Sequence, residues 1–367
     1  MVRIILITII FFTCFCAGYA QKDSFYSSFA QSINIKYKLG FLIAHREAIV
    51  HLPKSHFQTI ELSYDFHTRG NAGWQQTHKN PRFGVLVNAT FNENREVLGN
   101  AFGLGASVLF PKKTWGKSNA WSVNNKVALG LGYITKTFDV ENNPKNNAIG
   151  SHMNFLIVLG VELEYRLPDY HFSFGLDFTH YSNSGIKKPN LGLNIPSLRL
   201  GMGLMTKKSA YNESLLNFHR DDLQLLFTGI VTAKNNYDFQ NRLFPVFALS
   251  AHLSKAQYNR FRYVYGIDLV FSEANRQFLA SSADQSFLKT VQVGIYNGWE
   301  LDLSKVIFSA GMGVYAYNPL NPHGWFFHRI GCRIDITRRV YFHGYVRSHW
   351  AKADFFESGI GYKIGLR

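Results

Sequence analysis

Apolar and polar residues alternate with a period of two along most of this chain, and this pattern restricts the possible folds more than any other feature. In residues 59–67, one set of alternate positions is polar and the other is apolar, namely Ile60, Leu62, Tyr64 and Phe66. The same alternation recurs in residues 154–165 and near residues 340–349. Because successive side chains of a strand point to opposite faces, the pattern predicts β-strands with one apolar and one polar face.

The polar face also carries charged residues, such as Glu162 and Glu164. An apolar face toward lipid and a charged face toward a polar lumen are typical of outer-membrane barrels. We therefore expect an all-β fold, an antiparallel transmembrane β-barrel of roughly 12–16 strands. The candidate strands lie near residues 33–44, 55–67, 82–91, 98–110, 121–138, 153–166, 170–182, 197–206, 218–233, 240–252, 258–271, 287–300, 303–316, 324–335, 338–349 and 354–366.

The lengths of the connections predict which rim of the barrel faces the cell exterior. Long connections follow odd-numbered candidate strands and short turns follow even-numbered ones, which matches a barrel with a periplasmic N-terminus. The segment 68–81, RGNAGWQQTHKNPR, does not fit, because it is a long connection after an even-numbered strand.

The first twenty residues predict export. Arg3 is followed by an apolar stretch and by the small residues Gly18 and Ala20, so residues 1–20 have the pattern of a cleaved signal peptide. We expect residues 21–367 to form a single barrel domain in the outer membrane of a Gram-negative bacterium. A secreted β-sandwich or propeller is the alternative, although no blade-like repeat is present.

The composition agrees with a chain embedded in a membrane without spanning helices. Aromatic residues make up 16% and charged residues only 17% of the chain, against roughly 25% charged residues in soluble domains. The formal charge of +15 favours an anionic partner such as a phosphorylated lipid, and export disfavours nucleic acid. The 14 histidines are scattered without a metal-binding motif, so we expect no metal and no cofactor.

One stretch, GLDFTHYSNSGIKKPNLGLN (175–194), places polar residues at the end of an apolar strand face. His180 and Ser182 continue the alternate positions of Phe174, Leu176 and Phe178, so they would lie at the depth of the lipid head groups. A histidine beside a serine can remove the hydroxyl proton and create a nucleophile. The pair would then meet lipid ester bonds, whereas the alternative is ordinary polarity at a membrane interface.

The spacing His-x-Ser-Asn-x-Gly, followed by Pro-Asn-x-Gly, resembles the PagL-like lipid A 3-O-deacylase (acyloxyacyl hydrolase) family. The matching residues are His180, Ser182, Asn183, Gly185, Pro189, Asn190 and Gly192. The resemblance implies that Ser182 attacks the 3-O-linked acyl ester of lipid A with His180 as the general base. It also implies an oxyanion site formed by Asn190 and the backbone near Gly185, with Asn183 shaping the turn or assisting.

Two features leave alternatives open. Lys187 and Lys188 either bind a lipid A phosphate or are solvated loop charges. Compact members of the family have a glutamate twelve residues after the serine, and Asn194 stands at that position here. The third catalytic residue is therefore Asn194 or an unidentified residue. The alternative function is an inactive outer-membrane barrel that works as a channel or in surface interactions.

Overall fold

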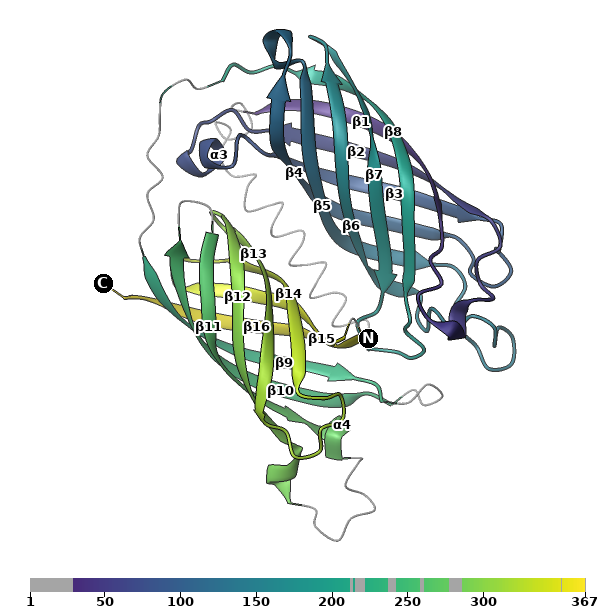
Figure 1. The fold of residues 1–367 in the computed structure, drawn as a ribbon, viewed down its shortest axis with the longest axis vertical. Helices are drawn as coiled ribbons and strands as arrows, with labels where there is room; N and C mark the ends of the chain where they lie inside the picture. Colours follow the sequence, from purple (N-terminus) through teal and green to yellow (C-terminus); the bar gives the residue numbers. More distant parts are fainter. Residues whose placement is uncertain are drawn as a thin grey trace.

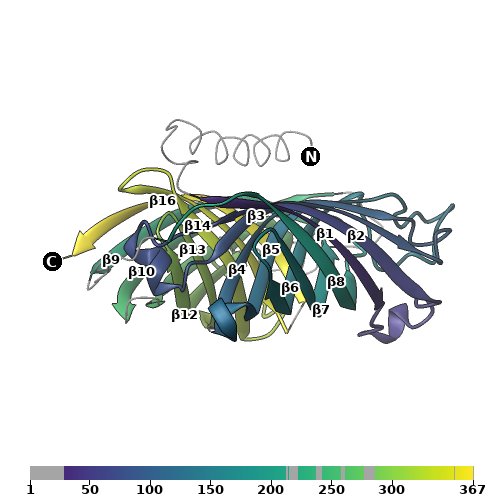
Figure 2. The same cartoon turned by 90° about the horizontal axis from the view of Figure 1, so that it is seen from above.

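The computed structural model describes residues 29–211, 214, 222–236, 242–257, 261–276, 286–350 and 352–366, so the predicted signal peptide lies outside the described residues. Its strands form two closed antiparallel barrels that lie beside each other (Figures 1 and 2). The first barrel comprises β1 Ala30–Phe41, β2 His56–His67, β3 Arg82–Asn92, β4 Ala101–Trp115, β5 Trp121–Ile134, β6 Met153–Arg166, β7 Tyr170–Ser182 and β8 Leu193–Lys207.

The second barrel comprises β9 Leu223–Lys234, β10 Phe244–Gln257, β11 Phe261–Ser272, β12 Val291–Leu303, β13 Val306–Tyr317, β14 Phe326–Asp335, β15 Val340–His349 and β16 Lys352–Leu366. The helical segments of the described residues are short. They are the α-helices α3 Gly73–Thr77 and α4 Glu273–Arg276, and the 3₁₀ turns η1 Glu47–Ile49, η2 Lys117–Asn119 and η4 Phe287–Thr290. Among the described residues, no helix is long and apolar enough to cross a membrane.

The all-β antiparallel fold is confirmed, but the prediction of one barrel is wrong. β1 pairs with β8 and β9 pairs with β16, so each set of eight strands closes on itself. Alternation along a strand shows which face is apolar, but it does not show which distant strand completes the ring. Strand number alone therefore could not distinguish one large barrel from two small ones.

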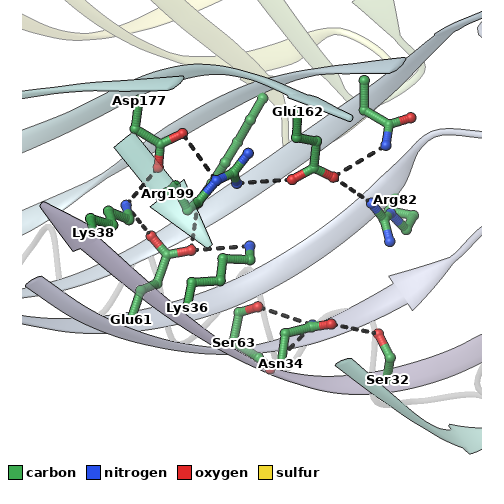
Figure 3. Close-up of polar contacts among 12 residues, drawn as sticks. Ser32, Asn34, Lys36, Lys38, Glu61, Ser63, Arg82, Glu162, Asp177 and Arg199 are labelled. Atoms are coloured by element: carbon green, nitrogen blue, oxygen red, sulfur yellow. Dashed lines mark hydrogen bonds and ion pairs between the residues drawn. The ribbon is translucent and has the colours of Figure 1, made fainter. Parts of the chain in front are cut away.

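The apolar faces of the strands point outward and the charged faces point into the lumens. In β2, Leu62 is 47% exposed, whereas its neighbour Glu61 is fully buried. Figure 3 shows the buried ion pairs of the first lumen, in which Glu61 contacts Lys36 at 3.1 Å and Lys38 at 2.6 Å. Asp177 also contacts Lys38, at 2.8 Å. An eight-stranded barrel is just wide enough for side chains to fill it.

The second lumen is filled in the same way. Arg329 contacts Asp268 at 2.9 Å, and Arg347 contacts Glu357 at 2.7 Å, with all four side chains almost completely buried. Burial of these charges is tolerated because each of the four is paired with an opposite charge. Both barrels are thus closed structural cylinders packed with ion pairs.

The unexpected length of the segment 68–81, which follows an even-numbered strand, is explained by its contacts with the second barrel. It contains α3, and the His78 Nε2 atom lies 2.7 Å from the carbonyl oxygen of Asp302 at the end of β12. The side chain of Gln76 donates to the carbonyl of Ser214, in the connection between the barrels, at 2.7 Å. The connection after β2 is long because it reaches across to the neighbouring barrel.

Candidate active site

The candidate site lies where β7 ends. β7 is held between β6 and β8, and its outward positions carry Phe174, Leu176 and Phe178 before His180 and Ser182. Phe178 is 36% exposed, whereas Ser182 is only 8% exposed, because the loop that follows folds over the strand end. The polar pair therefore faces the lipid side of the barrel under partial cover, as the alternation of the sequence predicted.

Three side chains form a continuous hydrogen-bonded chain. The Nε2 atom of His180 lies 2.9 Å from Ser182 Oγ, and its Nδ1 atom lies 2.5 Å from Asn194 Oδ1. Asn194 is the direct cross-strand partner of His180 in the β7–β8 ladder, so backbone pairing positions the contact. An amide oxygen only accepts, so the contact with Asn194 is a hydrogen bond when His180 carries its proton on Nδ1, and in that tautomer Nε2 presents a free lone pair to the serine hydroxyl.

His45 was not predicted from the sequence. It follows β1, and its Nδ1 atom lies 3.0 Å from the Nδ2 amino group of Asn194. The N–H of Ile43 donates to the carbonyl of Asn194 at 2.9 Å, which fixes this connection beside the start of β8. No motif links residue 45 to residue 194, so only the closure of β1 against β8 brings them together.

The loop after Ser182, residues 183–192, is organised by the buried side chain of Asn183. Its Nδ2 group donates to Ser151 Oγ at 2.9 Å and to the Lys187 carbonyl at 2.7 Å. Its Oδ1 atom accepts from the N–H groups of Gly185 at 3.1 Å and Lys187 at 3.3 Å. The Gly185 N–H, which the family resemblance implies as part of an oxyanion site, is thus engaged within the loop.

Asn190 is oriented by the same loop. Its Oδ1 atom accepts from the backbone N–H of Asn183 at 2.9 Å. The residue also forms an isolated β-bridge with Ile149, so both its backbone and its side chain are held. With the oxygen engaged, the Nδ2 amino group is the hydrogen-bond donor that remains on this amide.

Gly192 packs directly against the imidazole. Its φ of +80° is a left-handed conformation that other residues rarely adopt, and a Cβ atom there would lie 2.9 Å from His180 Cε1. Its N–H donates to the carbonyl of Ala148 at 3.0 Å. A residue without a side chain at this position lets the loop close over the histidine.

The two lysines of the loop have different surroundings. Lys188 Nζ donates to the carbonyl of Asn236, just after β9 in the second barrel, at 2.6 Å. Lys187 is half-buried, and its backbone is the part that Asn183 holds.

Among the described residues, no group of three or more His, Cys, Asp or Glu side chains is arranged to hold a metal ion.

Comparisons with known proteins match each barrel separately. Residues 58–203 match the family model of the lipid A 3-O-deacylase (PagL), and residues 222–366 match that of the acyloxyacyl hydrolase C-terminal domain. The comparison with curated proteins found no match.

Solved structures of outer-membrane proteins are also similar. The outer membrane enzyme PagL is 17% identical over 46% of this chain and 97% of its own, with a TM-score of 0.32. Neisserial surface protein A is 14% identical over 48% of this chain and 97% of its own, also with a TM-score of 0.32. A porin of Rhodopseudomonas blastica is 8% identical over 92% of this chain and 100% of its own, with a TM-score of 0.19.

Proposed function

Because the chain belongs to the lipid A 3-O-deacylase (PagL) family of outer-membrane ester hydrolases, we propose that it removes the 3-O-linked acyl chain of lipid A with Ser182 as the nucleophile. The observation that carries the proposal is the hydrogen-bonded chain from Ser182 through His180 to Asn194 on the lipid-facing side of β7. A serine, a general base and a residue that orients the base are the parts that acyl transfer requires.

The reaction begins when Ser182 Oγ attacks the ester carbonyl carbon and His180 Nε2 takes the hydroxyl proton. The tetrahedral intermediate collapses to an acyl-enzyme as the bond to the 3-oxygen of the sugar breaks, and His180 gives its proton to that departing oxygen, which leaves as a hydroxyl group. A water molecule then attacks the acyl-enzyme with His180 again as the base. The products are a free fatty acid and 3-O-deacylated lipid A, and Ser182 regains its proton.

The developing oxyanion needs a donor near Ser182. We assign this role to the Nδ2 group of Asn190, because its Oδ1 atom is engaged by the Asn183 N–H. Asn183 and Gly185 act indirectly, by holding the loop that carries Asn190. Of the two lysines, we assign Lys187 the role of binding a phosphate of lipid A, because the side chain of Lys188 contacts the second barrel.

Asn194 replaces the glutamate of the compact members and changes what the third residue can do. Its amide oxygen fixes the His180 tautomer in the same way as a carboxylate does. It carries no charge, so it does not neutralise the imidazolium that forms during attack. The site is therefore a Ser–His–Asn arrangement with correct proton placement and weaker charge stabilisation.

The alternative function as a channel is opposed by the lumens. Each eight-stranded ring is filled by paired, buried charged side chains such as Glu61 and Arg347, which leaves the interior as packed protein. The location of the polar residues His180 and Ser182 outside the barrel is also unrelated to conduction.

Mass spectrometry of lipid A tests the proposed function. Lipid A from cells that express the parent protein should lack one 3-O-linked acyl chain, and lipid A from cells that express Ser182→Ala should retain it. The heat-modifiable mobility of both proteins on gels checks that each barrel is folded. Identical lipid A from the two strains would reject the assignment of Ser182.

A further inference from the structure

The amide of Asn194 lies between two imidazole rings. Its Oδ1 atom is 2.5 Å from Nδ1 of His180, and its Nδ2 atom is 3.0 Å from Nδ1 of His45. One end of an amide accepts hydrogen bonds and the other end donates them. The orientation of this amide therefore links the proton positions of the two rings.

We propose that His45 is a positioning residue that selects the catalytic tautomer of His180 through Asn194. The proposal rests on the Ser182–His180 mechanism proposed above. When His45 Nδ1 carries no proton, it accepts from Asn194 Nδ2 and turns the amide oxygen toward His180. His180 must then be protonated on Nδ1, which leaves Nε2 to accept the proton of Ser182.

The opposite orientation of the amide would disable the base. With Nδ2 turned toward His180, the ring would have to accept at Nδ1 and carry its proton on Nε2. Nε2 would then donate to Ser182 Oγ, 2.9 Å away, and could not take the serine proton. A carboxylate accepts at both oxygens, so it has no orientation that disables the base. An asparagine at position 194 does have one, and another residue must therefore select the orientation of its amide.

The backbone of the connection after β1 is attached beside Asn194, and the side chain of His45 is exposed there. The Ile43 N–H donates to the Asn194 carbonyl at 2.9 Å, so backbone and side-chain contacts join the same two segments. The carbonyl of Ile43 is the competing partner of His45 Nδ1, at the longer distance of 3.4 Å. A proton on Nδ1 would favour that carbonyl and would oppose the Nδ2 group of Asn194.

The sharpest test replaces His45 with a residue that only donates. In His45→Lys, an ammonium facing position 194 should attract the amide oxygen and turn Nδ2 toward His180. We expect kcat to fall about tenfold, with KM changed less than about twofold, because the hydrogen bond from the ammonium to the amide oxygen favours the wrong orientation. His45→Ala leaves the orientation unselected and should lower kcat by a smaller factor, about twofold to fivefold.

Repeating the His45→Lys substitution in an Asn194→Asp variant separates the effect on the amide orientation from other effects of the lysine. In Asn194→Asp, both ends of the side chain accept, so His45→Lys should change kcat by less than about twofold relative to Asn194→Asp alone. His51→Lys is the matched control for charge. His51 is exposed in the same connection, and its Nε2 lies 2.7 Å from the Lys145 carbonyl, away from the catalytic residues. This control should retain parental activity.

The tautomer itself can be measured without any reaction. Nitrogen-15 spectra of histidine-labelled protein in detergent micelles should show His180 protonated on Nδ1 in the parent and on Nε2 in His45→Lys. Parental kcat in His45→Lys, an equal loss in both backgrounds, or an unchanged His180 tautomer would each overturn the role of His45. Full activity of Ser182→Ala would instead reject the proposed function, and the spectra would still decide the role of His45.

Discussion

The N–H of Asn235, at the end of β9 in the second barrel, donates a hydrogen bond of 3.0 Å to the carbonyl of Gly185, in the loop beside Ser182 of the first barrel. Lys188 of the same loop donates to the carbonyl of Asn236 at 2.6 Å. Close by, the ring of Phe155 in β6 stacks on Phe356 in β16, with centroids 4.7 Å apart. The loop that carries the proposed oxyanion donor thus has one of its supports in the neighbouring barrel.

Substituting alanine for Gly185 should misplace this loop. The residue has a φ of +83°, and a Cβ atom would lie 2.4 Å from the Asp354 carbonyl oxygen in the second barrel. We expect turnover to fall about tenfold to a hundredfold, because small misplacements of reacting groups are costly. Gly324→Ala is the matched control, since its φ is +89° but no atom lies within 4 Å. Equal deacylation rates for the two variants would show that the contact between barrels does not position the loop.

Gly192→Ala should impair the base itself. The added Cβ would lie 2.9 Å from His180 Cε1 and 3.5 Å from Ser182 Cβ, so the imidazole or the loop must move. We expect kcat to fall about tenfold or more while the barrel remains folded. Single-turnover deacylation in mixed micelles measures the effect, again with Gly324→Ala as the control. A parental kcat in Gly192→Ala would mean that the loop moves to accommodate the added Cβ atom without displacing His180.

Ser182→Ala and His180→Ala should each abolish deacylation. The two residues share one hydrogen bond and one proton transfer, so the double variant should be no worse than either single one. Lipid A mass spectrometry and purified-enzyme rates provide the measurement. Additive losses in the double variant would indicate that the two residues do not act as a unit.

Asn194→Ala should lower turnover about fivefold, because it removes the hydrogen bond that fixes the His180 tautomer. Asn194→Asp keeps the shape and adds a charge, and Asn194→Glu introduces the acid found in compact family members. We expect both acidic variants to match or exceed the parent, because a carboxylate stabilises the imidazolium at the low-dielectric membrane rim. Unchanged turnover in Asn194→Ala would show that another residue orients His180.

Glu61→Gln should destabilise the first barrel. Glu61 is the shared partner of Lys36, Lys38 and Lys126, all buried, so its loss leaves uncompensated charge in the lumen. We expect a loss of about 3–5 kcal/mol in the free energy of unfolding, measured by urea denaturation in detergent. Asp169→Asn removes the partner of Lys208 in an ion pair whose side chains are 58% and 60% exposed. That control should cost less than about 1 kcal/mol. Equal midpoints for the two variants would contradict this role of Glu61.

The sequence by itself determined the strands and their faces, because side-chain alternation is a local property of the chain. Predicted strands at 153–166 and 170–182 coincide with β6 and β7. His180 and Ser182 lie two residues apart, so their shared outward face followed from strand geometry alone. β8 was predicted to begin at residue 197, but it begins at Leu193, because Pro196 resembles a strand boundary in the sequence. Asn194 therefore lies within the strand, directly opposite His180.

Only the tertiary structure decided how many barrels the strands make and what surrounds the catalytic pair. The closure of β1 on β8 and of β9 on β16 depends on hydrogen bonds between strands far apart in the chain, and no local pattern specifies these partners. The first closure places His45 against Asn194. Contact between the two barrels gives the 68–81 segment its partner Asp302 and gives Gly185 its partner Asn235. Each of these contacts joins common groups, such as backbone carbonyls, amides and imidazoles, which occur throughout the chain. The sequence does not indicate which of these groups are partners, because the partners come together only when the two barrels close and pack against each other.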